Sequence, residues 1–539
     1  MSGKVGMSGI LMLGQLLLLT VSLAAGPGPM PVYNIKDYGA VGDGRVKNTG
    51  AIQQAVDEAN EAGGGRVYFP PGDYISGTII LKSGVTLYLE TGATLLGSTD
   101  TLDYPSIRPA FRSFTDGYVS QSLIFAEKQN DIGIAGRGTI NGQGEHFQWK
   151  EYGNRPDVIR FVSCKYVNVQ DVRLRNSAMW MQHYLNCEFV TVRGIHVSNH
   201  STYNNDMIDI DCCRNVTISD CYGNSDDDAL TLKSTADHPT ENVTVTNCVL
   251  GSGCNAIKMG TESNGGFKNI SITNCTIDSR LDDKGFYGLG ERGSAGIALE
   301  IVDGGTLENI TISNITIKNV NSPLFLRLGN RARPFIPGGK KPGVGTWRNV
   351  VISNIIATEL GDYGCSILGI PDKSIENVTL SNIRMRFPGG GTSEHASTAL
   401  PEKIDSYPDA WQFGTLPAWG FFCRHVDGLR MENIDIELET EDARPAMVFD
   451  DVANLDLDGL SERRAVVSDA PTVVLRDVRD AGIRACRPLS ETPVFMLLQG
   501  TVKRISAIGN EIPRAGKLFA TQDGADSEEV FQASNRIGK

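Results

Sequence analysis

The feature that most constrains the fold of this chain is a short repeat in its middle. Asn215-Val-Thr-Ile-Ser-Asp-Cys221 is followed by Asn242-Val-Thr-Val-Thr-Asn-Cys248 and Asn269-Ile-Ser-Ile-Thr-Asn-Cys275, at a constant spacing of 27 residues (215, 242, 269). Each copy alternates apolar and polar residues, which indicates a short strand with one buried face. Further copies begin at Asn309, Asn349 and Asn377 after longer steps, which indicates loops inserted into a constant coil.

A strand of this kind cannot bury its apolar face alone, whereas stacked copies share one continuous core. Helical patterns of 10–15 residues, which a βαβ fold needs between its strands, do not separate the copies. The repeat therefore predicts an all-β, single-domain parallel β-helix. The length of 539 residues then reflects the number of coils rather than the number of domains.

Three segments make up the predicted organisation. Residues 1–24 carry Lys4, an apolar stretch and the small residues of Ser22-Leu23-Ala24, which together are typical of a secretory signal peptide. That apolar stretch is short for a membrane span. Residues 31–100 are expected to form the N-terminal cap and first coils, with an amphipathic helix at 49–62 covering the open end. Residues 101–539 continue the β-helix with long loop insertions.

The charge and the cysteine content limit the partners and the cellular compartment that we expect for the chain. The formal net charge is -13, from 50 basic and 63 acidic residues, which argues against a nucleic-acid partner. We expect a secreted or periplasmic monomer that is free of the membrane once the signal is removed. Among the 11 cysteines, Cys221, Cys248 and Cys275 share one repeat position and are expected to stack inward as buried thiols. Bridges elsewhere, for example at Cys212 or Cys213, stay open.

Carboxylates gather on two consecutive coils. The segments are Asn204-Asn-Asp-Met-Ile-Asp-Ile-Asp211 and Ser225-Asp-Asp-Asp-Ala-Leu-Thr-Leu-Lys-Ser234. Aligning their apolar residues places Asp206 beside Asp228 and Asn205 beside Asp227, on strands ~4.8 Å apart. Such clustering is costly and often marks function. The residues alone fit glycoside hydrolysis, a Ca²⁺ site or a solvated turn.

Several motifs resemble glycoside hydrolase family 28, the polygalacturonase-like enzymes. They are the pair 37–44 and 69–74, the segment Asn176-Ser-Ala-Met-Trp-Met-Gln-His183, and the triplets Asn204-Asn205-Asp206 and Asp226-Asp227-Asp228. The resemblance covers residues 32–452 and implies a right-handed β-helix. It also implies an inverting hydrolase of pectic or related polysaccharides and oligosaccharides that needs no metal or other cofactor. Asp227 would be the general acid and Asp206 and Asp228 would activate water, with Asn204 near the substrate.

The chain departs from the family at its basic residues. The Gly-His-Gly motif aligns with Gly253-Cys254-Asn255, and the Arg-x-Lys motif aligns with Ala298-Leu299-Glu300. In polygalacturonases these cations are expected to bind the galacturonate carboxylate, so their loss weakens binding of an acidic sugar. Glu300 adds repulsion.

Other residues are candidates to replace the missing cations. By the same alternation, Lys233, Glu300 and Arg327 occupy equivalent outward positions, Lys258 lies one step along, and Arg331 and Arg333 follow in a loop. The basic residues among them either contact the substrate or pair with Glu300. Trp180 and His183 are candidates to line a sugar subsite, although a structural role is the alternative for His183.

Long insertions at 101–128, 279–294, 329–346 and 386–419 interrupt the coils, and insertions on repeat proteins tend to lie on the binding face. They supply aromatic residues suited to sugar stacking: Tyr104, Phe286, Tyr287, Tyr407, Trp411 and Trp419. A groove closed by such loops favours exo attack at chain ends. The alternative functions are a Ca²⁺-dependent polysaccharide lyase, with Lys258 or Arg327 as base, and a non-catalytic glycan-binding protein.

Overall fold

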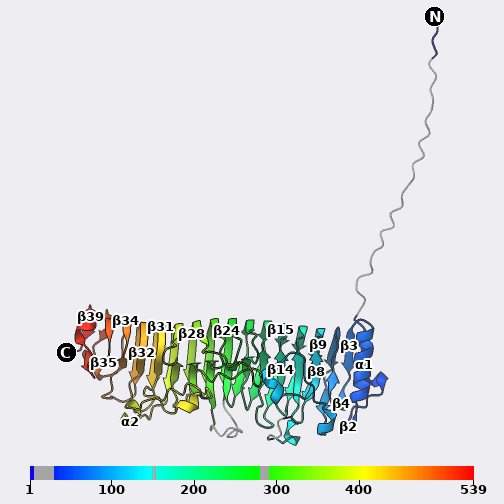
Figure 1. The fold of residues 1–539 in the computed structure, drawn as a ribbon, viewed down its shortest axis with the longest axis horizontal. Coiled ribbons are helices and arrows are strands. Elements are labelled where there is room, and N and C mark those ends of the chain that lie inside the picture. The colour runs from blue at the N-terminus through cyan, green and yellow to red at the C-terminus, as the bar shows by residue number, and fades with distance from the viewer. Residues whose placement is uncertain (5–29, 149, 151–152, 280–290, 539) are drawn as a thin grey trace.

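The computed structural model describes residues 1–4, 30–148, 150, 153–279 and 291–538. The predicted signal peptide therefore lies almost entirely outside the described residues. From residue 30 onward the described chain forms one elongated solenoid, with β3(Gly65–Phe69) near one tip and β39(Val530–Ala533) at the other (Figure 1). No helix among the described residues is long and apolar enough to cross a membrane.

Three ladders of parallel strands run the length of the solenoid, and each coil passes through the third, first and second ladder in turn. The first ladder contains β1(Val32–Asn34), β3(Gly65–Phe69), β6(Val85–Leu89), β9(Asn130–Gly136), β12(Lys165–Gln170), β15(Glu188–Arg193), β18(Arg214–Ser219), β21(Thr240–Thr246), β24(Gly266–Asp278), β26(Thr306–Lys318), β28(Thr346–Thr358), β30(Ile375–Phe387), β31(Phe421–Leu438), β32(Met447–Arg464), β34(Arg479–Arg484), β36(Lys503–Ile508) and β39(Val530–Ala533).

The second ladder has fewer separate strands, because from β24 onward the longer strands supply both it and the first ladder. Its separate strands are β2(Asp43–Lys47), β4(Gly72–Ser76), β7(Ala93–Gly97), β10(Thr139–Asn141), β13(Arg173–Arg175), β16(His196–Asn199), β19(Tyr222–Ser225) and β22(Val249–Ser252).

The third ladder carries the carboxylate cluster. Its strands are β5(Ile79–Ile80), β8(Ser122–Glu127), β11(Asp157–Val162), β14(Gln182–Leu185), β17(Ile208–Asp211), β20(Leu230–Ser234), β23(Asn255–Ser263), β25(Gly293–Ile301), β27(Val320–Leu328), β29(Cys365–Leu368), the starts of β31 and β32, β33(Val473–Arg476), β35(Thr492–Gln499) and β38(Ala515–Gln522). Outside the ladders, β37(Glu511–Ile512) pairs with β40(Arg536–Ile537).

The register follows the apolar alternation of the sequence. Ile208 lies opposite Leu230 and Ile210 opposite Leu232, and all four side chains are buried. One continuous apolar core extends from Ile35 to Leu518. The predicted all-β, single-domain, right-handed parallel β-helix is thus confirmed.

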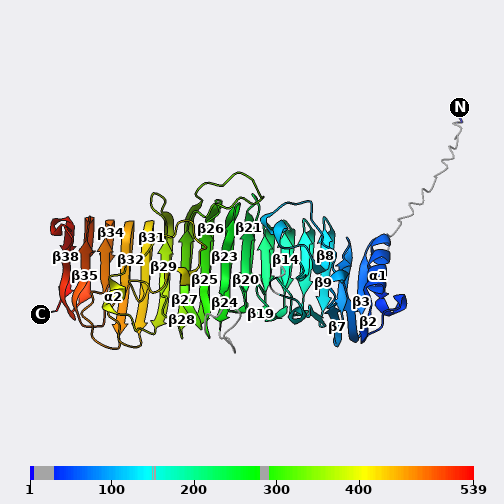
Figure 2. The same ribbon diagram turned by 60° about the horizontal axis from the view of Figure 1, so that its bottom comes forward.

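The N-terminal tip is covered by α1(Thr49–Glu61), which lies beside β3 at the end of the solenoid (Figure 2). Ile52, Ala55, Val56 and Ala59 form its fully buried face, as expected from their spacing. The other described helices are short: η1(Ile35–Tyr38), η2(Thr101–Asp103), η3(Phe114–Gly117), η4(Gly144–His146), α2(Ser393–Ala396), η5(Ala410–Phe413) and η6(Ser527–Glu529).

The cysteines follow the repeat. All 11 lie within the described part of the chain, and every one is a buried free thiol. Cys221, Cys248 and Cys275 occupy successive coils of the core, as their spacing predicts. The open possibility of a bridge at Cys212 or Cys213 is not realised.

Candidate active site

The three aspartates of the family motifs meet at one edge of the third ladder. Asp206 lies in the turn before β17, and Asp227 and Asp228 lie in the turn between β19 and β20. The Met207 N–H donates to the Asp228 carbonyl oxygen at 2.9 Å, which locks the two turns side by side. Asp206 and Asp228 are buried, whereas Asp227 is partly exposed.

Asp228 is held from the next coil. The Lys258 ammonium lies 2.9 Å from its Oδ2, and the Asn255 backbone N–H and side-chain amide donate to its Oδ1 at 3.1 and 2.8 Å. Burial by itself lowers the pKa of Lys258, but the carboxylates around it, Asp228 foremost, raise that pKa well above its usual range. Lys258 therefore stays protonated, and its ammonium is held in the ion pair with Asp228.

Lys233 lies among three carboxylates on the other side of the cluster. Its ammonium is 3.7 Å from Asp206, 3.5 Å from Asp209 and 3.7 Å from Glu262, and it lies over the Trp180 ring at 4.8 Å. Burial raises the pKa of Asp206 well above its usual range and raises the pKa of Asp209 to about 8. One carboxylate of this closely coupled pair therefore holds a proton near neutral pH.

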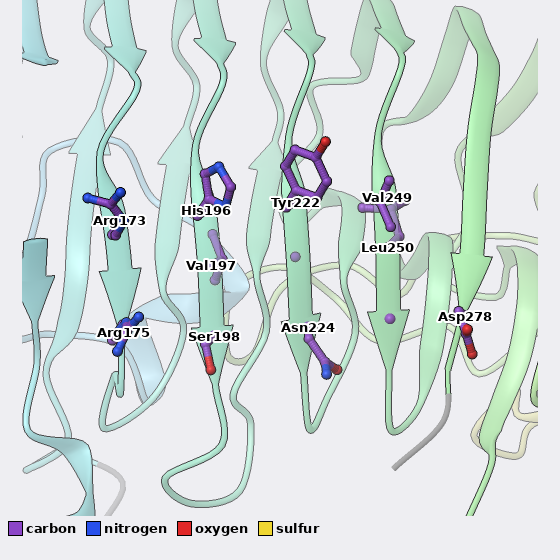
Figure 3. A pocket seen from close by; sticks show the side chains of 12 residues that line it. Arg173, Arg175, His196, Val197, Ser198, Tyr222, Asn224, Val249, Leu250 and Asp278 are labelled. Atoms are coloured by element: carbon purple, nitrogen blue, oxygen red, sulfur yellow. The ribbon is translucent and has the colours of Figure 1, made fainter. Parts of the chain in front are cut away.

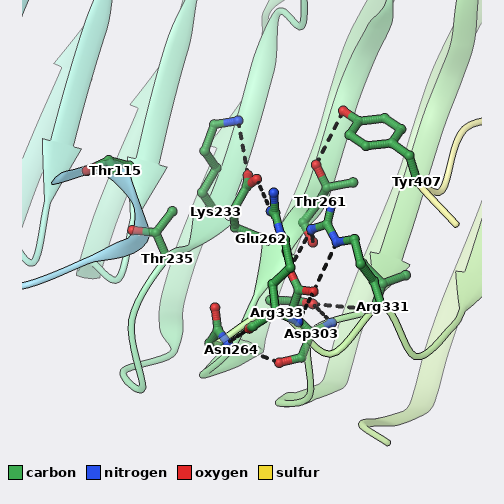
Figure 4. Close-up of polar contacts among 12 residues, drawn as sticks. Thr115, Lys233, Thr235, Thr261, Glu262, Asn264, Asp303, Arg331, Arg333 and Tyr407 are labelled. Atoms are coloured by element: carbon green, nitrogen blue, oxygen red, sulfur yellow. Dashed lines mark hydrogen bonds and ion pairs between the residues drawn. The ribbon is translucent and has the colours of Figure 1, made fainter. Parts of the chain in front are cut away.

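A second ion network anchors the 329–346 insertion beside Lys233 (Figure 4). Arg333 lies 2.6 Å from Glu262, and Arg331 donates two hydrogen bonds to the buried carboxylate of Asp303. Burial opposes ionisation of Glu262, but Lys233 and Arg333 outweigh it and hold the pKa of Glu262 well below its usual range. The network therefore holds Arg333 at the wall of the cleft, where part of its side chain is exposed.

Two adjoining pockets form the cleft above these residues, and they share Asn204, Asp227 and Tyr407. The first, here called the Arg333 pocket, has a volume of about 430 Å³ and is lined also by Phe114, Tyr118, Met179, Trp180, Asp206, Asp228, Lys233, Thr261, Glu262 and Arg333. The second, the Trp411 pocket, has a volume of about 310 Å³ and is lined also by Cys254, Asn255, Lys258, Asp409 and Trp411. Asp227 therefore stands at their junction.

Of the predicted substrate residues, Asn204, Trp180, Lys233 and Lys258 line this cleft. His183 does not, because it is fully buried and contacts Asp211 at 3.1 Å. Burial lowers the pKa of His183, so the imidazole is neutral. The structural alternative for His183 is the one that the geometry favours.

The expected pairing of Glu300 with Arg327 is wrong. The two residues are opposite each other in the register, but the Arg327 guanidinium donates to the carbonyl oxygens of Gly369, Glu402 and Lys403. Arg327 thus holds the 386–419 insertion rather than the cleft. Within the described residues, the Glu300 carboxylate has no hydrogen-bond partner, and burial raises its pKa well above the usual range.

The insertions supply cleft residues, although not all of the predicted ones. Tyr407 and Trp411 line the cleft and are 44% and 43% exposed. The expectation that Tyr104 and Trp419 stack on sugars is wrong, because both are buried by packing inside the coil. Phe286 and Tyr287 lie outside the described residues.

Of the basic residues expected in the loop, Arg333 lines the cleft. Cleft residues that were not predicted include Phe114, Tyr118, Glu262 and Asp409. Three of these four come from the insertions 101–128 and 386–419. The length of these insertions was the signal that pointed to them, but it did not identify individual side chains.

A larger hollow of about 530 Å³ lies elsewhere, on the outer face of the second ladder (Figure 3). Arg173, His196 and Tyr222 lie on neighbouring strands there, and Asp278 lies at its far end. The three aspartates are not among its lining residues. Its size therefore does not make it the reactive site.

The donor set of the cluster is a poor match for Ca²⁺. Atoms of Asp227, Asp228 and Cys254 lie within 4.8 Å of one another. Calcium takes six to eight oxygen ligands. Here one donor is sulfur, and both oxygens of Asp228 already have partners in Lys258 and Asn255.

Known proteins are similar to this chain in sequence and in fold. The model of glycosyl hydrolases family 28 matches residues 70–404. A probable polygalacturonase of Vitis vinifera is 34% identical over 215 residues, which are 37% of this chain and 44% of that protein. An exo-poly-alpha-D-galacturonosidase of Dickeya chrysanthemi is 39% identical over 148 residues, which are 25% of this chain and 23% of that protein. The matches thus span less than half the length of either relative.

The fold has a counterpart in a solved structure. The crystal structure of a hyperthermoactive exopolygalacturonase from Thermotoga maritima superposes with a TM-score of 0.59 and 22% identity. The superposition covers 76% of this chain and 92% of that one. At this identity the likeness concerns the fold.

Proposed function

Because the chain belongs to glycosyl hydrolases family 28, we propose that it is an inverting O-glycosyl hydrolase that cleaves a pectic polysaccharide or oligosaccharide. One observation carries the proposal: Asp227 stands where two pockets meet, and Asp206 and Asp228 line only one of them. A proton donor at the junction, with two carboxylates on one side, matches the demands of inversion.

The two pockets then have different tasks. Asp206 and Asp228 hold a water molecule in the Arg333 pocket, and one of them accepts its proton as the water attacks the anomeric carbon of the sugar bound there. Asp227 gives its own proton to the glycosidic oxygen as the bond to carbon breaks. The sugar that leaves occupies the Trp411 pocket.

The insertions that meet beside the Arg333 pocket favour exo action. The Arg333 guanidinium lies 4.0 Å over the ring of Phe114, so the insertions 329–346 and 101–128 meet beside this pocket. A chain end fits such a pocket better than the middle of a polymer does. We expect single-sugar products from oligosaccharides, and a rapid fall in polymer viscosity with little monomer would contradict exo action.

We further propose that the protein is exported, works as a monomer and needs no cofactor. The apolar segment within residues 1–24 supports export. Sequencing the N-terminus of the exported protein tests this, and a mature chain that begins after Ala24 is the expected result. Gel filtration of the purified protein tests the monomer.

The central test is Asp227→Asn. Removing the general acid should lower kcat by about 10²–10⁴-fold, measured as sugar release from oligogalacturonides, with an unchanged melting temperature. Asp278→Asn, in the hollow of Figure 3, is the matched control and should keep full activity. A fully active Asp227→Asn enzyme would rule out the assignment.

The lyase alternative needs a cationic residue free to act as base. Lys258 is buried against Asp228 and has a raised pKa, and Arg327 is bound to three carbonyl groups, so neither is suited to the task. Unsaturated, ultraviolet-absorbing products that disappear with a chelator would favour the lyase. Binding without turnover across a glycan panel would favour a non-catalytic protein.

A further inference from the structure

The two pockets of the cleft differ in the charges that they offer a sugar. The Arg333 pocket contains two cations, Lys233 and Arg333, beside the carboxylates of Asp206, Asp228 and Glu262. The Arg333 guanidinium lies 2.6 Å from Glu262, and 31% of its side chain remains exposed to a ligand. In the Trp411 pocket, Lys258 is the one cation among the described lining residues, and it lies with Asp227 and Asp409. The two sugars on either side of the cleaved bond therefore meet different electrostatic environments.

Lys258 has no positive charge to spare for a ligand. Its ammonium is 2.9 Å from Asp228, and Glu300 and Asp409 act on it as well. Its side chain is also almost completely buried. A carboxylate arriving in the Trp411 pocket would compete with Asp228 for this ammonium.

The carboxylate of Asp409 also disfavours binding of an acidic sugar in the Trp411 pocket. Its Oδ1 accepts a hydrogen bond from the Ser294 hydroxyl at 3.1 Å, which fixes the carboxylate at the pocket wall. Like charges brought together away from water repel strongly. A uronate bound here would face the carboxylate of Asp409, whereas Asp227, as the general acid, is protonated and adds no repulsion.

The pocket does offer partners for an uncharged sugar. Asn255 is almost fully buried, and within the described residues its side-chain oxygen has no hydrogen-bond partner. A sugar hydroxyl can donate to this oxygen and to Asp409. The half-exposed rings of Trp411 and Tyr407 supply apolar surface for the face of a sugar ring.

We propose that the Trp411 pocket receives an uncharged leaving group, so that the bond cleaved joins a uronate in the Arg333 pocket to a sugar without a free carboxylate. This inference rests on the proposed function. Two kinds of leaving group share the required chemistry: a neutral sugar, and a uronate whose carboxylate is methyl-esterified.

The test compares three substrates that share a galacturonate at the non-reducing end. They are unesterified digalacturonate, the same disaccharide methyl-esterified on its reducing-end residue, and galacturonate linked to a neutral deoxyhexose. We expect kcat/KM to be at least about tenfold higher for one or both uncharged leaving groups, a ratio that corresponds to one modest charge repulsion. The faster of these two substrates shows whether the natural leaving group is a methyl-esterified uronate or a neutral sugar. Equal or faster cleavage of digalacturonate overturns the inference.

Variants connect the preference to the pocket. Asp409→Asn keeps an acceptor for Ser294 but removes the charge, so the preference for uncharged over unesterified substrate should fall by about tenfold. Asp278→Asn removes an acid outside the cleft and should leave the preference unchanged. A preference that survives Asp409→Asn in full would contradict the electrostatic origin.

Failure of the proposed function looks different from failure of this inference. Nitrophenyl galacturonide, whose leaving group carries no carboxylate, reports on the chemistry alone. If neither it nor any of the three disaccharides is cleaved, the hydrolase assignment fails and the inference fails with it. If it and digalacturonate are both cleaved without a preference for uncharged groups, only the inference fails.

Discussion

The asparagine-lined turns and the aspartate-bearing turns are both stacks of polar residues on successive coils, yet they are stabilised in opposite ways. Asn354 donates its side-chain amide to Asn314 at 2.9 Å, and Asn314 donates to Asn274 at 3.1 Å. A second row runs through Asn215, Asn242 and Asn269 in the same manner. An amide both donates and accepts, so identical residues satisfy one another.

Carboxylates cannot do this, because ionised oxygens only accept. Asp206 and Asp228 therefore depend on Lys233 and Lys258, which reach them from neighbouring strands of the third ladder. The asparagine rows gain stability from repetition, whereas the carboxylate cluster depends on unlike partners. A polar stack that needs cations from other coils is thus the mark of the reactive region.

The largest expected effect comes from breaking the cluster. Lys258→Met leaves the Asp228 carboxylate buried without its cation, which should cost about 3–5 kcal/mol of the free energy of unfolding. Urea denaturation measures this, and activity should be lost as well. Lys268→Met, which removes a surface ion pair with Glu308, is the control and should cost less than about 1 kcal/mol. Equal effects of the two variants would contradict the comparison.

A pH dependence distinguishes the cluster from the neutral asparagine rows. With a pKa of about 8, Asp209 holds its proton in the folded chain at pH values where the unfolded chain has lost it. The folded state therefore loses stability as pH rises from about 4 to 8, and the loss stops above about 8. Asp209→Asn should remove about 2 kcal/mol of this loss between pH 6 and pH 8. If the free energy of unfolding depended on pH in the same way in the wild-type protein and in Asp209→Asn, that result would contradict a bound proton on the Asp206–Asp209 pair.

The asparagine rows should respond more weakly. Asn314 has a φ of 57° and exchanges hydrogen bonds with both neighbours. Asn314→Ala should cost about 1–2 kcal/mol, because alanine is strained in the left-handed region and ends the row. Asn314→Gly relieves the strain and should recover part of the loss. Both variants should keep full activity. A large loss of activity would show that the carboxylate cluster depends on the asparagine rows, which would contradict the comparison.

The smallest effect is expected from a reductant. Since all 11 cysteines are free thiols, dithiothreitol should leave the melting temperature unchanged, whereas a native disulfide would contribute about 2–5 kcal/mol. A clear drop in the melting temperature would reveal a bridge between copies or within the chain.

The sequence predicted the ladder register well enough to bring the aspartates together. Alternation of apolar residues places Ile208 beside Leu230, and a register slip would turn that apolar set outward, so Asp206 necessarily neighbours Asp228. The same logic placed Glu300 beside Arg327 in the backbone, but it failed for the contact between their side chains. A long arginine side chain reaches whichever acceptors the neighbouring loop provides.

By itself, the sequence determined the solenoid, its capping helix, the inward thiols and the meeting of the three aspartates, because these depend on a repeated local pattern. Only the tertiary structure decided which loop residues complete the cleft, among them the unpredicted Phe114, Tyr118 and Asp409. Their positions depend on how insertions far apart in the chain pack against one another and against the third ladder. No period in the sequence encodes that packing.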